Sequence, residues 1–454
     1  MPFRIIITRS SSQRPFLTQS NSPFEVPTVR ANQKPDGFYR SSKAQHRQLV
    51  FQALYHQGPI SRYKLAEVLK LRYRTLRRLL SEMLHEGIIQ ESGNVIVRRG
   101  RAPIFLSVNP HGGRIIGIAL DACEVTGVLV GLDLSLQRTS HAKIGRNSSR
   151  KAILENIHSV IAELRQSPEG RMAPLCGIGY GEYGLVDANA GVAVRSTYHR
   201  AWHDVPIKEQ LQKSYGVPVS IETEERCVLL AEHIWGAIPD TQTALLIEVT
   251  SGIGFAVLDR GELFSGARGF GGELGHIRLV RDGDACPCGS RGCLETVVST
   301  RGIIEEMRQG LRHERGGTPA GHADRVTLER VIQSAMQGDA LAGHVVGKTA
   351  SYLGQAAGIA INLFNPDAVL LRGEMFRVGG SWLLDTVQHE ADSCVLKELK
   401  MGVRWRLSML ESAAARGAAA RVFAEIFGFN LSLLPRPAVP ILEKSRRTMA
   451  REGR

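Results

Sequence analysis

Apolar residues near the start of the chain recur at helical spacing. Leu76, Leu79, Leu80, Met83 and Leu84 follow the i, i+3, i+4, i+7, i+8 pattern, which places all of them on one face of a helix. Two shorter amphipathic stretches precede this one, and residues 88–91 and 95–98 follow it as candidate strands. Residues 44–109 therefore predict three short helices followed by a β-hairpin.

The first two predicted helices are separated by a Gly-Pro pair at positions 58–59. Leu49, Val50, Leu54 and Tyr55 give the first helix its apolar face. Ser61 is a suitable N-cap for the second helix, because a serine hydroxyl can accept a hydrogen bond from a backbone N–H of the first turn.

The opposite face of the third predicted helix is basic and resembles the recognition helix of a winged helix-turn-helix. Such a helix enters the major groove of DNA, and the Arg-Gly-Arg sequence at 99–101 suits the narrow minor groove. The alternative is a solvated basic helix on an ordinary domain. The side chains that we expect to contact DNA are Arg72, Tyr73, Arg74, Thr75, Arg77, Arg78, Arg99 and Arg101.

The remainder of the chain alternates predicted strands with helices. Residues 115–120 and 125–132 read as a hairpin, and further strands are expected at 174–178, 217–221, 243–249, 254–258 and 368–371. Such alternation over most of the chain predicts an α/β fold, which we expect to form two lobes.

The charge of the chain is concentrated in the predicted DNA-binding segment. The chain has 454 residues and a formal net charge of +13, and residues 41–110 carry 12 Lys and Arg against 4 Asp and Glu, a net of 12 − 4 = +8. This excess favours a polyanionic partner. No apolar run approaches twenty residues and no secretory signal opens the chain, so we expect no membrane contact and a cytoplasmic location, on the bacterial nucleoid while bound to DNA.

The two ends of the chain are basic and poor in core-forming residues. Residues 1–40 are rich in Ser, Pro, Gln and Arg and predict a flexible arm; a transit peptide is the alternative, but no amphipathic helix is evident. Residues 434–454 predict a similarly loose basic tail.

Three cysteines and one histidine form a candidate metal site. His276, Cys286, Cys288 and Cys293 supply one imidazole and three thiolates, a complete tetrahedral shell for a structural zinc ion. Disulfides are the alternative, and they fit poorly because the chain has seven cysteines, an odd number, and no sign of secretion.

The sequence around this cluster resembles the signature of the ROK family. The matching segments are Gly-Glu-Leu-Gly-His at 272–276 and Cys-Pro-Cys-Gly-Ser-Arg-Gly-Cys-Leu-Glu at 286–295, and further matches occur along most of the chain. The family comprises repressors, open reading frames of unknown role and sugar kinases. The resemblance implies an actin-like, ribonuclease-H-like pair of α/β lobes with a sugar in the cleft, and its repressor branch carries a winged helix in front.

The catalytic and phosphate-binding positions of the family kinases are altered in this chain. The resemblance places Thr223 and Glu224 where those kinases have an asparagine and the aspartate that acts as general base. The longer Glu224 side chain shifts the carboxylate, and a misplacement of about 1 Å can cost roughly a hundredfold in rate. Side chains at residues 121–126 replace a Gly-Gly-Thr turn, residues 372–374 replace a glycine-rich segment, and 250–254 keeps only part of the second phosphate loop. We therefore expect no kinase activity.

The sugar-binding positions are better preserved. The resemblance assigns Glu273, His276 and Glu295 to sugar hydroxyls, with one His276 nitrogen on zinc and the other on sugar. Glu224 and His199 are further candidate effector residues, although His199 departs from the family asparagine. Glu295 could instead steady the zinc loop, and these departures leave open an unusual sugar or a pocket that no longer binds one.

These observations predict a DNA-binding transcriptional regulator, specifically a repressor, that responds to a sugar or sugar derivative and contains a structural Zn2+. The expected organisation is an arm at 1–40, a winged helix-turn-helix at 41–110, a sugar-binding domain at 111–433 with its zinc loop at 276–293, and a tail at 434–454. The expected partners are double-stranded operator DNA, a sugar effector and a second copy of the chain, as a homodimer or a dimer of dimers. The alternatives are a sugar kinase with an appended DNA-binding module, and a constitutive DNA-binding protein whose pocket is inactive.

Overall fold

A computed structural model describes residues 42–92, 104–145, 148–196, 198–239, 241–314, 326–431 and 434 of the chain. The predicted arm at 1–40, the predicted strand at 95–98, Arg99 and Arg101, and the tail beyond residue 434 lie outside these residues. None of the described helices is long and apolar enough to cross a membrane.

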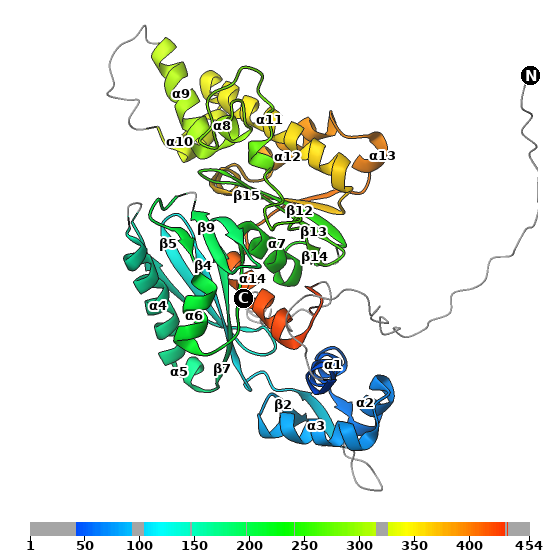
Figure 1. Ribbon diagram of the computed structural model, residues 1–454. Helices are drawn as coiled ribbons and strands as arrows, with labels where there is room; N and C mark the ends of the chain where they lie inside the picture. Colours follow the sequence, from blue (N-terminus) through cyan, green and yellow to red (C-terminus); the bar gives the residue numbers. More distant parts are fainter. Residues whose placement is uncertain are drawn as a thin grey trace, which may run out of the picture.

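The described residues 42–92 and 104–108 form an N-terminal unit of three helices and a three-stranded sheet (Figure 1). The helices are α1 (Ser42–Gln57), α2 (Arg62–Leu69) and α3 (Tyr73–His85), and the strands are β1 (Ile60–Ser61), β2 (Ile89–Ser92) and β3 (Phe105–Val108) in the order β1-β3-β2. The Ser61 hydroxyl accepts a hydrogen bond from the Lys64 backbone N–H at 3.3 Å, so the predicted N-cap is present. Strand β2 pairs antiparallel with β3, while residues 95–98, the expected second strand of the hairpin, lie outside the described residues.

The buried face of α1 differs from the predicted one. Val50 and Leu54 are buried as expected, but Leu49 is 38% exposed, whereas Phe51 is only 1% exposed. Phe51 is buried because α1 also contacts the last helix of the chain, which the local periodicity of α1 does not reveal.

The first lobe is built on a five-stranded sheet. Its strands β4 (Arg114–Leu120), β5 (Glu124–Val130), β6 (Leu136–Lys143), β7 (Leu175–Glu182) and β11 (Val219–Thr223) lie in the order β11-β7-β4-β5-β6. The helices α4 (Arg150–Gln166), α5 (Pro168–Arg171) and α6 (Ile207–Tyr215) and a small sheet of β8 (Gly184–Asp187), β9 (Val192–Ser196) and β10 (His203–Val205) complete it.

The second lobe repeats this topology. Its strands β12 (Thr243–Val249), β13 (Ile253–Asp259), β14 (Glu262–Leu263), β15 (Ala368–Gly373) and β16 (Arg404–Leu407) lie in the order β14-β13-β12-β15-β16. In each lobe, three consecutive antiparallel strands are extended by two parallel strands beside the first of them. The remaining elements are η1 (Leu274–His276), α8 (Glu295–Val298), α9 (Thr300–Glu314), α10 (Leu328–Met336), α11 (Ala340–Phe364), α12 (Glu374–Asp392) and α13 (Lys397–Lys400). The predicted α/β fold with two related lobes is confirmed.

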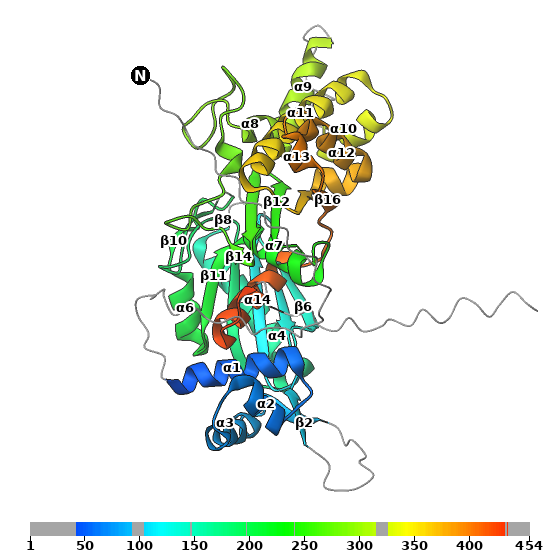
Figure 2. The same ribbon diagram turned by 90° about the vertical axis from the view of Figure 1, so that its right-hand side faces the viewer.

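Two helices lie between the lobes. These are α7 (Glu224–Trp235) and α14 (Ala413–Phe427), and they pack along each other. Helix α14 covers β4 and β7 of the first lobe, while α7 contacts β12 and β13 of the second. Figures 1 and 2 both show α14 beside the first sheet, with α1 next to its C-terminal end. One cluster of buried side chains runs through α7, α14 and both sheets, and it continues into the N-terminal unit.

Candidate metal centre and neighbouring pocket

The four predicted metal ligands meet in the segment that connects β14 with α8. His276 is the last residue of η1, Cys286 and Cys288 lie on a turn, and Cys293 lies two residues before the start of α8. One ligand atom from each of these residues lies within 4.8 Å of all the others. The structure therefore brings together the residues that the sequence indicated.

Backbone hydrogen bonds hold this turn in shape. The Cys286 N–H donates to the Ser290 carbonyl at 2.8 Å, and the Gly292 N–H donates to the Asp284 carbonyl at 2.9 Å. Gly292 has a φ of +72°, and a Cβ atom there would lie 2.0 Å from the Val280 carbonyl oxygen. A side chain at this position would open the turn, so glycine is required for the cysteines to converge.

The donor set fits a tetrahedral ion that prefers sulfur and nitrogen. Cys286 and Cys293 are buried, and Cys288 is exposed. Three sulfurs and one imidazole satisfy zinc without a solvent ligand, which is typical of a structural site rather than a catalytic one. These residues can hold a metal ion, and the sulfur-rich donor set disfavours Mg2+ or Ca2+, which prefer oxygen.

The two ring nitrogens of His276 face different surroundings. Nδ1 lies 3.7 Å from the Cys286 sulfur, inside the cluster. Nε2 lies 3.8 Å from a carboxylate oxygen of Glu273, on the other side of the ring. A metal on Nδ1 therefore leaves Nε2 protonated and directed away from the metal, available as a hydrogen-bond donor.

A pocket of about 270 Å3 adjoins the metal centre and includes three of the predicted effector residues. Glu273, His276 and Glu295 all line it. A Glu295 oxygen also accepts a hydrogen bond from the Ile253 backbone N–H at 3.3 Å, so this side chain both faces the pocket and contacts a neighbouring strand.

The pocket is also lined by residues that the sequence analysis did not single out. Tyr183 and Arg195 come from the first lobe, and Glu225 comes from the first turn of α7. Burial raises the pKa of Glu225 to about 7. Glu225 and the neighbouring Arg226 directly follow the predicted residue Glu224 in the first turn of α7, and this was the signal that could have identified them.

The predicted effector residues Glu224 and His199 do not line this pocket. Glu224 lines an adjacent cavity of about 670 Å3. His199 is only 1% exposed, and its Nε2 lies 3.0 Å from the Asp121 carbonyl oxygen. Consecutive residues of a helix are rotated by about 100° around its axis, which explains why Glu224 and Glu225 reach different cavities.

The adjacent cavity lies where the resemblance places the nucleotide, and acidic groups dominate it. Asp121, Glu224, Glu248, Glu374 and Glu411 line it, with Arg372 and Arg377 as its basic residues. Burial, followed by the charge of Glu248, raises the pKa of Glu224 well above its ordinary value.

Two contacts fill positions that a phosphate would need in this cavity. The Asp121 carboxylate accepts hydrogen bonds from the backbone N–H groups of Cys123 and Glu124, at 2.7 and 3.0 Å. Arg372 donates to Glu248 at 2.8 Å and to the Ser408 hydroxyl at 3.3 Å. Both the loop amides and Arg372 therefore already have partners within the protein.

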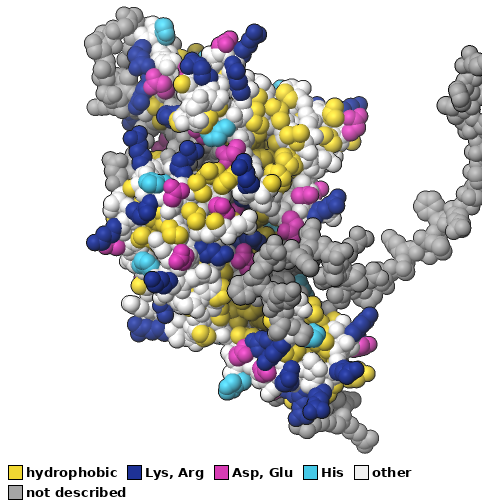
Figure 3. All heavy atoms as spheres, viewed as in Figure 1, with side chains coloured by type: hydrophobic (Ala, Val, Ile, Leu, Met, Phe, Trp, Pro, Cys, Tyr) yellow, Lys and Arg dark blue, Asp and Glu magenta, His cyan; other side chains and the backbone are white. Residues whose placement is uncertain are grey.

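The described residues that were predicted to contact DNA lie at the start of α3. Arg72, Tyr73, Arg74, Arg77 and Arg78 are exposed, and Thr75 is partly exposed. Leu76, Leu79, Leu80 and Met83 form the buried face of the same helix, as predicted. Figure 3 shows Lys and Arg side chains on the end of the molecule where α2 and α3 lie, and further basic residues on the lobes.

Comparisons with known proteins agree with this architecture. The model of the ROK family matches residues 115–425. The xylose repressor of Bacillus subtilis strain 168 is 27% identical over 360 residues, which cover 79% of this chain and 89% of the repressor.

Two solved structures are similar to the chain, one of a transcriptional regulator and one of a sugar kinase. A ROK family transcriptional regulator, a homologue of the Escherichia coli MLC protein, is 25% identical with a TM-score of 0.72, and the match covers 86% of this chain and 98% of that one. A ROK family glucokinase from Streptomyces griseus, in complex with glucose and AMPPNP, is 22% identical with a TM-score of 0.57, over 68% of this chain and 98% of the kinase. The kinase likeness is one of fold, whereas the regulator match extends over more of the chain.

Proposed function

The chain belongs to the ROK family, in its transcriptional-regulator branch, and from this premise we propose that it is a DNA-binding repressor whose affinity for its operator changes when a sugar binds. The observation that carries the proposal is the combination, in one chain, of an exposed basic helix α3 with a pocket in which Glu273, His276 and Glu295 meet.

In this proposal, α3 occupies the major groove of operator DNA. Its exposed arginines contact phosphates or guanine edges, which accept hydrogen bonds from guanidinium groups. Tyr73 is 55% exposed at the first position of the helix, and a ring there can pack against the DNA backbone. Arg99 and Arg101 are proposed to follow the minor groove.

A structural zinc ion held by His276 and the three cysteines supports the pocket. When bound, the ion fixes the ring of His276 and thereby directs Nε2 toward the effector. Loss of the metal would leave the arginines of α3 in place, because the N-terminal unit contributes none of the four ligands.

The charges around the pocket favour an effector without a phosphate group. Its lining has the carboxyl groups of Glu225, Glu248, Glu273 and Glu295, against Arg195 and the imidazole of His276. Burial raises the pKa of Glu225 to about 7 and Glu248 is paired with Arg372, so Glu273 and Glu295 supply most of the negative charge. Carboxylates accept hydrogen bonds from sugar hydroxyls or amines, but they repel phosphate. We therefore propose a neutral or amino sugar as the effector.

A sugar kinase with an appended DNA-binding module is the second candidate, because the fold is shared with a glucokinase. The acidic cavity and the internal partners of Asp121 and Arg372 argue against ATP. Formation of ADP from ATP and a panel of sugars, abolished by Glu224→Ala, would establish the kinase instead.

The regulator is tested by selecting its DNA site from a random library and then measuring affinity at moderate salt with D-xylose, D-glucose, D-glucosamine, N-acetyl-D-glucosamine and D-glucose 6-phosphate. We expect a palindromic site and a thermal shift with at least one unphosphorylated sugar, which also changes DNA affinity. Absence of specific DNA binding would refute the regulator, and DNA binding that no sugar alters would leave a constitutive DNA-binding protein.

A further inference from the structure

We propose that helices α7 and α14 act as one rigid body that couples the sugar pocket to the DNA-binding unit, with a joint at each end. The inference rests on the proposed function and adds the elements and residues through which the two sites communicate. Allosteric coupling requires that a ligand favour one of two arrangements of an element that both sites contact.

The joint at the pocket end is Arg226. This side chain is 2% exposed, and it donates to the Glu222 carboxylate at 2.9 Å. It also donates to the carbonyl oxygens of Gly269 and Gly271, at 3.0 and 2.8 Å. Those glycines belong to the loop that leads to Glu273, so Arg226 ties the first turn of α7 to the metal-centre side of the pocket.

The pocket is therefore formed by two parts of the protein, helix α7 and the loop that carries Glu273, and Arg226 connects them. Glu225 lies on α7, while Glu273 and His276 lie on the loop beyond Gly271. A sugar that hydrogen-bonds to both sides draws α7 and the loop together. Because the buried arginine is held by three partners, its geometry cannot change independently of either side.

Helices α7 and α14 are too closely packed to absorb such a displacement. A Cβ atom at Gly417 of α14 would lie 1.8 Å from the Cys227 carbonyl oxygen of α7. On the other side of α14, Cβ atoms at Gly117 and Gly179 would lie 1.9 and 1.8 Å from the carbonyl oxygens of Ala415 and Ala418. Backbones in direct contact move together or slide as units, because close-packed interiors compress little.

The joint at the DNA-binding end connects α14 with α1. The Gln48 amide donates to the Ile426 carbonyl at 3.0 Å, and the Gln52 amide donates to the carbonyls of Phe427, at 3.0 Å, and Gly428. These carbonyls belong to the last two residues of α14 and its C-cap, where a helix has no internal donors for them. The Phe51 and Phe427 rings stack with their centroids 4.0 Å apart.

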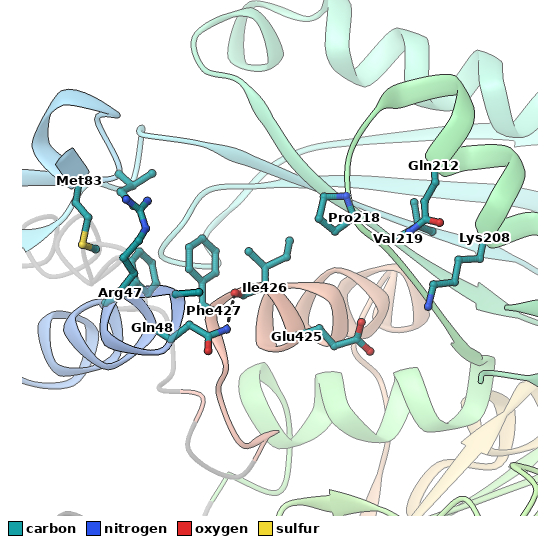
Figure 4. A pocket seen from close by; sticks show the side chains of 13 residues that line it. Arg47, Gln48, Met83, Lys208, Gln212, Pro218, Val219, Glu425, Ile426 and Phe427 are labelled. Carbon is teal, nitrogen blue, oxygen red and sulfur yellow. Dashed lines mark hydrogen bonds between the residues drawn. The ribbon is translucent and has the colours of Figure 1, made fainter. Parts of the chain in front are cut away.

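A cavity beside this joint leaves α1 room to move. It has a volume of about 500 Å3 and lies between α1, α6 and the end of α14. Figure 4 shows Gln48 directed at Ile426 on one side of the cavity, with Gln212 of α6 on the far side. Because α14 also contacts the first sheet closely, α7, α14 and that sheet move together, and their displacement is passed to α1 through the joint.

The coupling is tested with the double variant Gln48→Ala/Gln52→Ala, which removes the hydrogen bonds of this joint and leaves both sites untouched. The matched control is Gln212→Ala, a glutamine of the same cavity whose side chain has no hydrogen bond within the described part of the chain. The probe is the sugar of the panel that gives the largest thermal shift. For each protein, the affinity for sugar alone, the affinity for DNA alone and the ratio of DNA affinities with and without sugar are measured.

We expect a ratio of about 5 to 150 for the wild-type protein and the control, in the ordinary range of allosteric coupling. The double variant should bind sugar and DNA separately with near wild-type affinity, and its ratio should fall close to one. A double variant that keeps the wild-type ratio would overturn the inference. If the DNA affinity of the wild-type protein is the same with and without sugar, sugar control itself is refuted.

Hydrogen–deuterium exchange on the wild-type protein provides a second measurement that does not depend on a substitution. Sugar should change the exchange of peptides from α7, from the end of α14 and from α1 together. A sugar-dependent change in α1 without one in α14 would exclude this route, as would a change confined to the pocket.

Discussion

His276 has the most consequential position of any single residue, because its two nitrogens lie in different sites. Nδ1 is 3.7 Å from the Cys286 sulfur, while the ring also lines the pocket. The sequence predicted this residue because all four metal ligands lie within 18 positions of one another, so that their spacing alone indicates a metal site. Arg195 and Glu225 could not be found in this way, since they reach the pocket from separate elements whose meeting depends on tertiary structure.

Removal of one sulfur tests the metal centre. In Cys293→Ser, zinc measured by inductively coupled plasma mass spectrometry should fall from about one ion per chain to nearly none, because a serine hydroxyl is a poor fourth ligand. Sugar affinity should fall with it, while DNA affinity without sugar persists. Cys394→Ser is the control, because Cys394 is exposed and lies outside the cluster. Full zinc content in Cys293→Ser would contradict the assignment.

Glu182 at the end of β7 is expected to make stability depend on pH. Burial raises its pKa to about 8, and the side chain accepts hydrogen bonds from Tyr180 at 2.7 Å and Trp202 at 2.8 Å. The unfolded carboxyl loses its proton near its ordinary value of 4.5. Between these values the folded state binds more protons than the unfolded state, so stability falls as pH rises, by up to roughly 1.4 kcal/mol per pH unit.

Glu182→Gln removes this titration while keeping an oxygen that can accept from both neighbours. The melting temperature of the variant, measured from pH 5 to pH 8, should decline less than that of the wild-type protein. Glu155→Gln, an exposed change on α4, should leave the decline unaltered. If the melting temperature declines equally in Glu182→Gln and in the wild-type protein, Glu182 does not cause the pH dependence of stability.

At the scale of elements, helices with a single apolar stripe were predictable and α14 was not. Helix α3 has one buried face, so its periodicity is clear. Residues 413–427 are instead mostly alanine and other apolar residues, and 11 of these 15 residues are buried. A helix that is buried over most of its surface has only a narrow polar face, so its period is hard to recognise. Helix α14, which is proposed to couple the sugar pocket to the DNA-binding unit, was therefore difficult to predict from the sequence.

The proposed DNA contacts of α3 are tested with Arg77→Ala. Loss of one guanidinium contact should weaken specific binding by about 1–3 kcal/mol if it reads a base, or should reduce the salt dependence of binding by about one unit of slope if it contacts a phosphate. Arg312→Ala removes an exposed arginine of the second lobe that pairs with Glu305 and should have neither effect. Unchanged DNA binding and salt dependence in Arg77→Ala would remove α3 from the interface.

At the scale of the whole molecule, the two lobes have the same strand order. The alternation of strands and helices predicted the fold class, and the family motifs predicted the paired lobes. Neither predicted that the lobes share α7 and α14 between their inner faces, because that arrangement depends on contacts between residues such as Cys227 and Gly417, far apart in sequence.

We propose that the chain acts as a homodimer, whose two copies of α3 read two half-sites. DNA with both half-sites about one helical turn apart should then bind much more tightly than a single half-site, and insertion of about half a turn should abolish the gain. Gel-shift titration combined with sedimentation of the free protein checks this outcome. Equal affinity for one and two half-sites would indicate that single copies act independently.

The buried cluster that joins the N-terminal unit to the lobes limits how such a protein can be rearranged. Phe51 of α1 is buried against Phe427 and Phe423 of α14, so a cut near residue 110 would expose aromatic rings on both fragments. The N-terminal unit therefore does not have a hydrophobic core separate from that of the lobes. A chimaera in which residues 42–108 are exchanged to change the operator specificity should fold and respond to sugar only if the final turn of α14 is exchanged as well. We therefore expect the residues that recognise the operator and those in the final turn of α14 to change together during evolution.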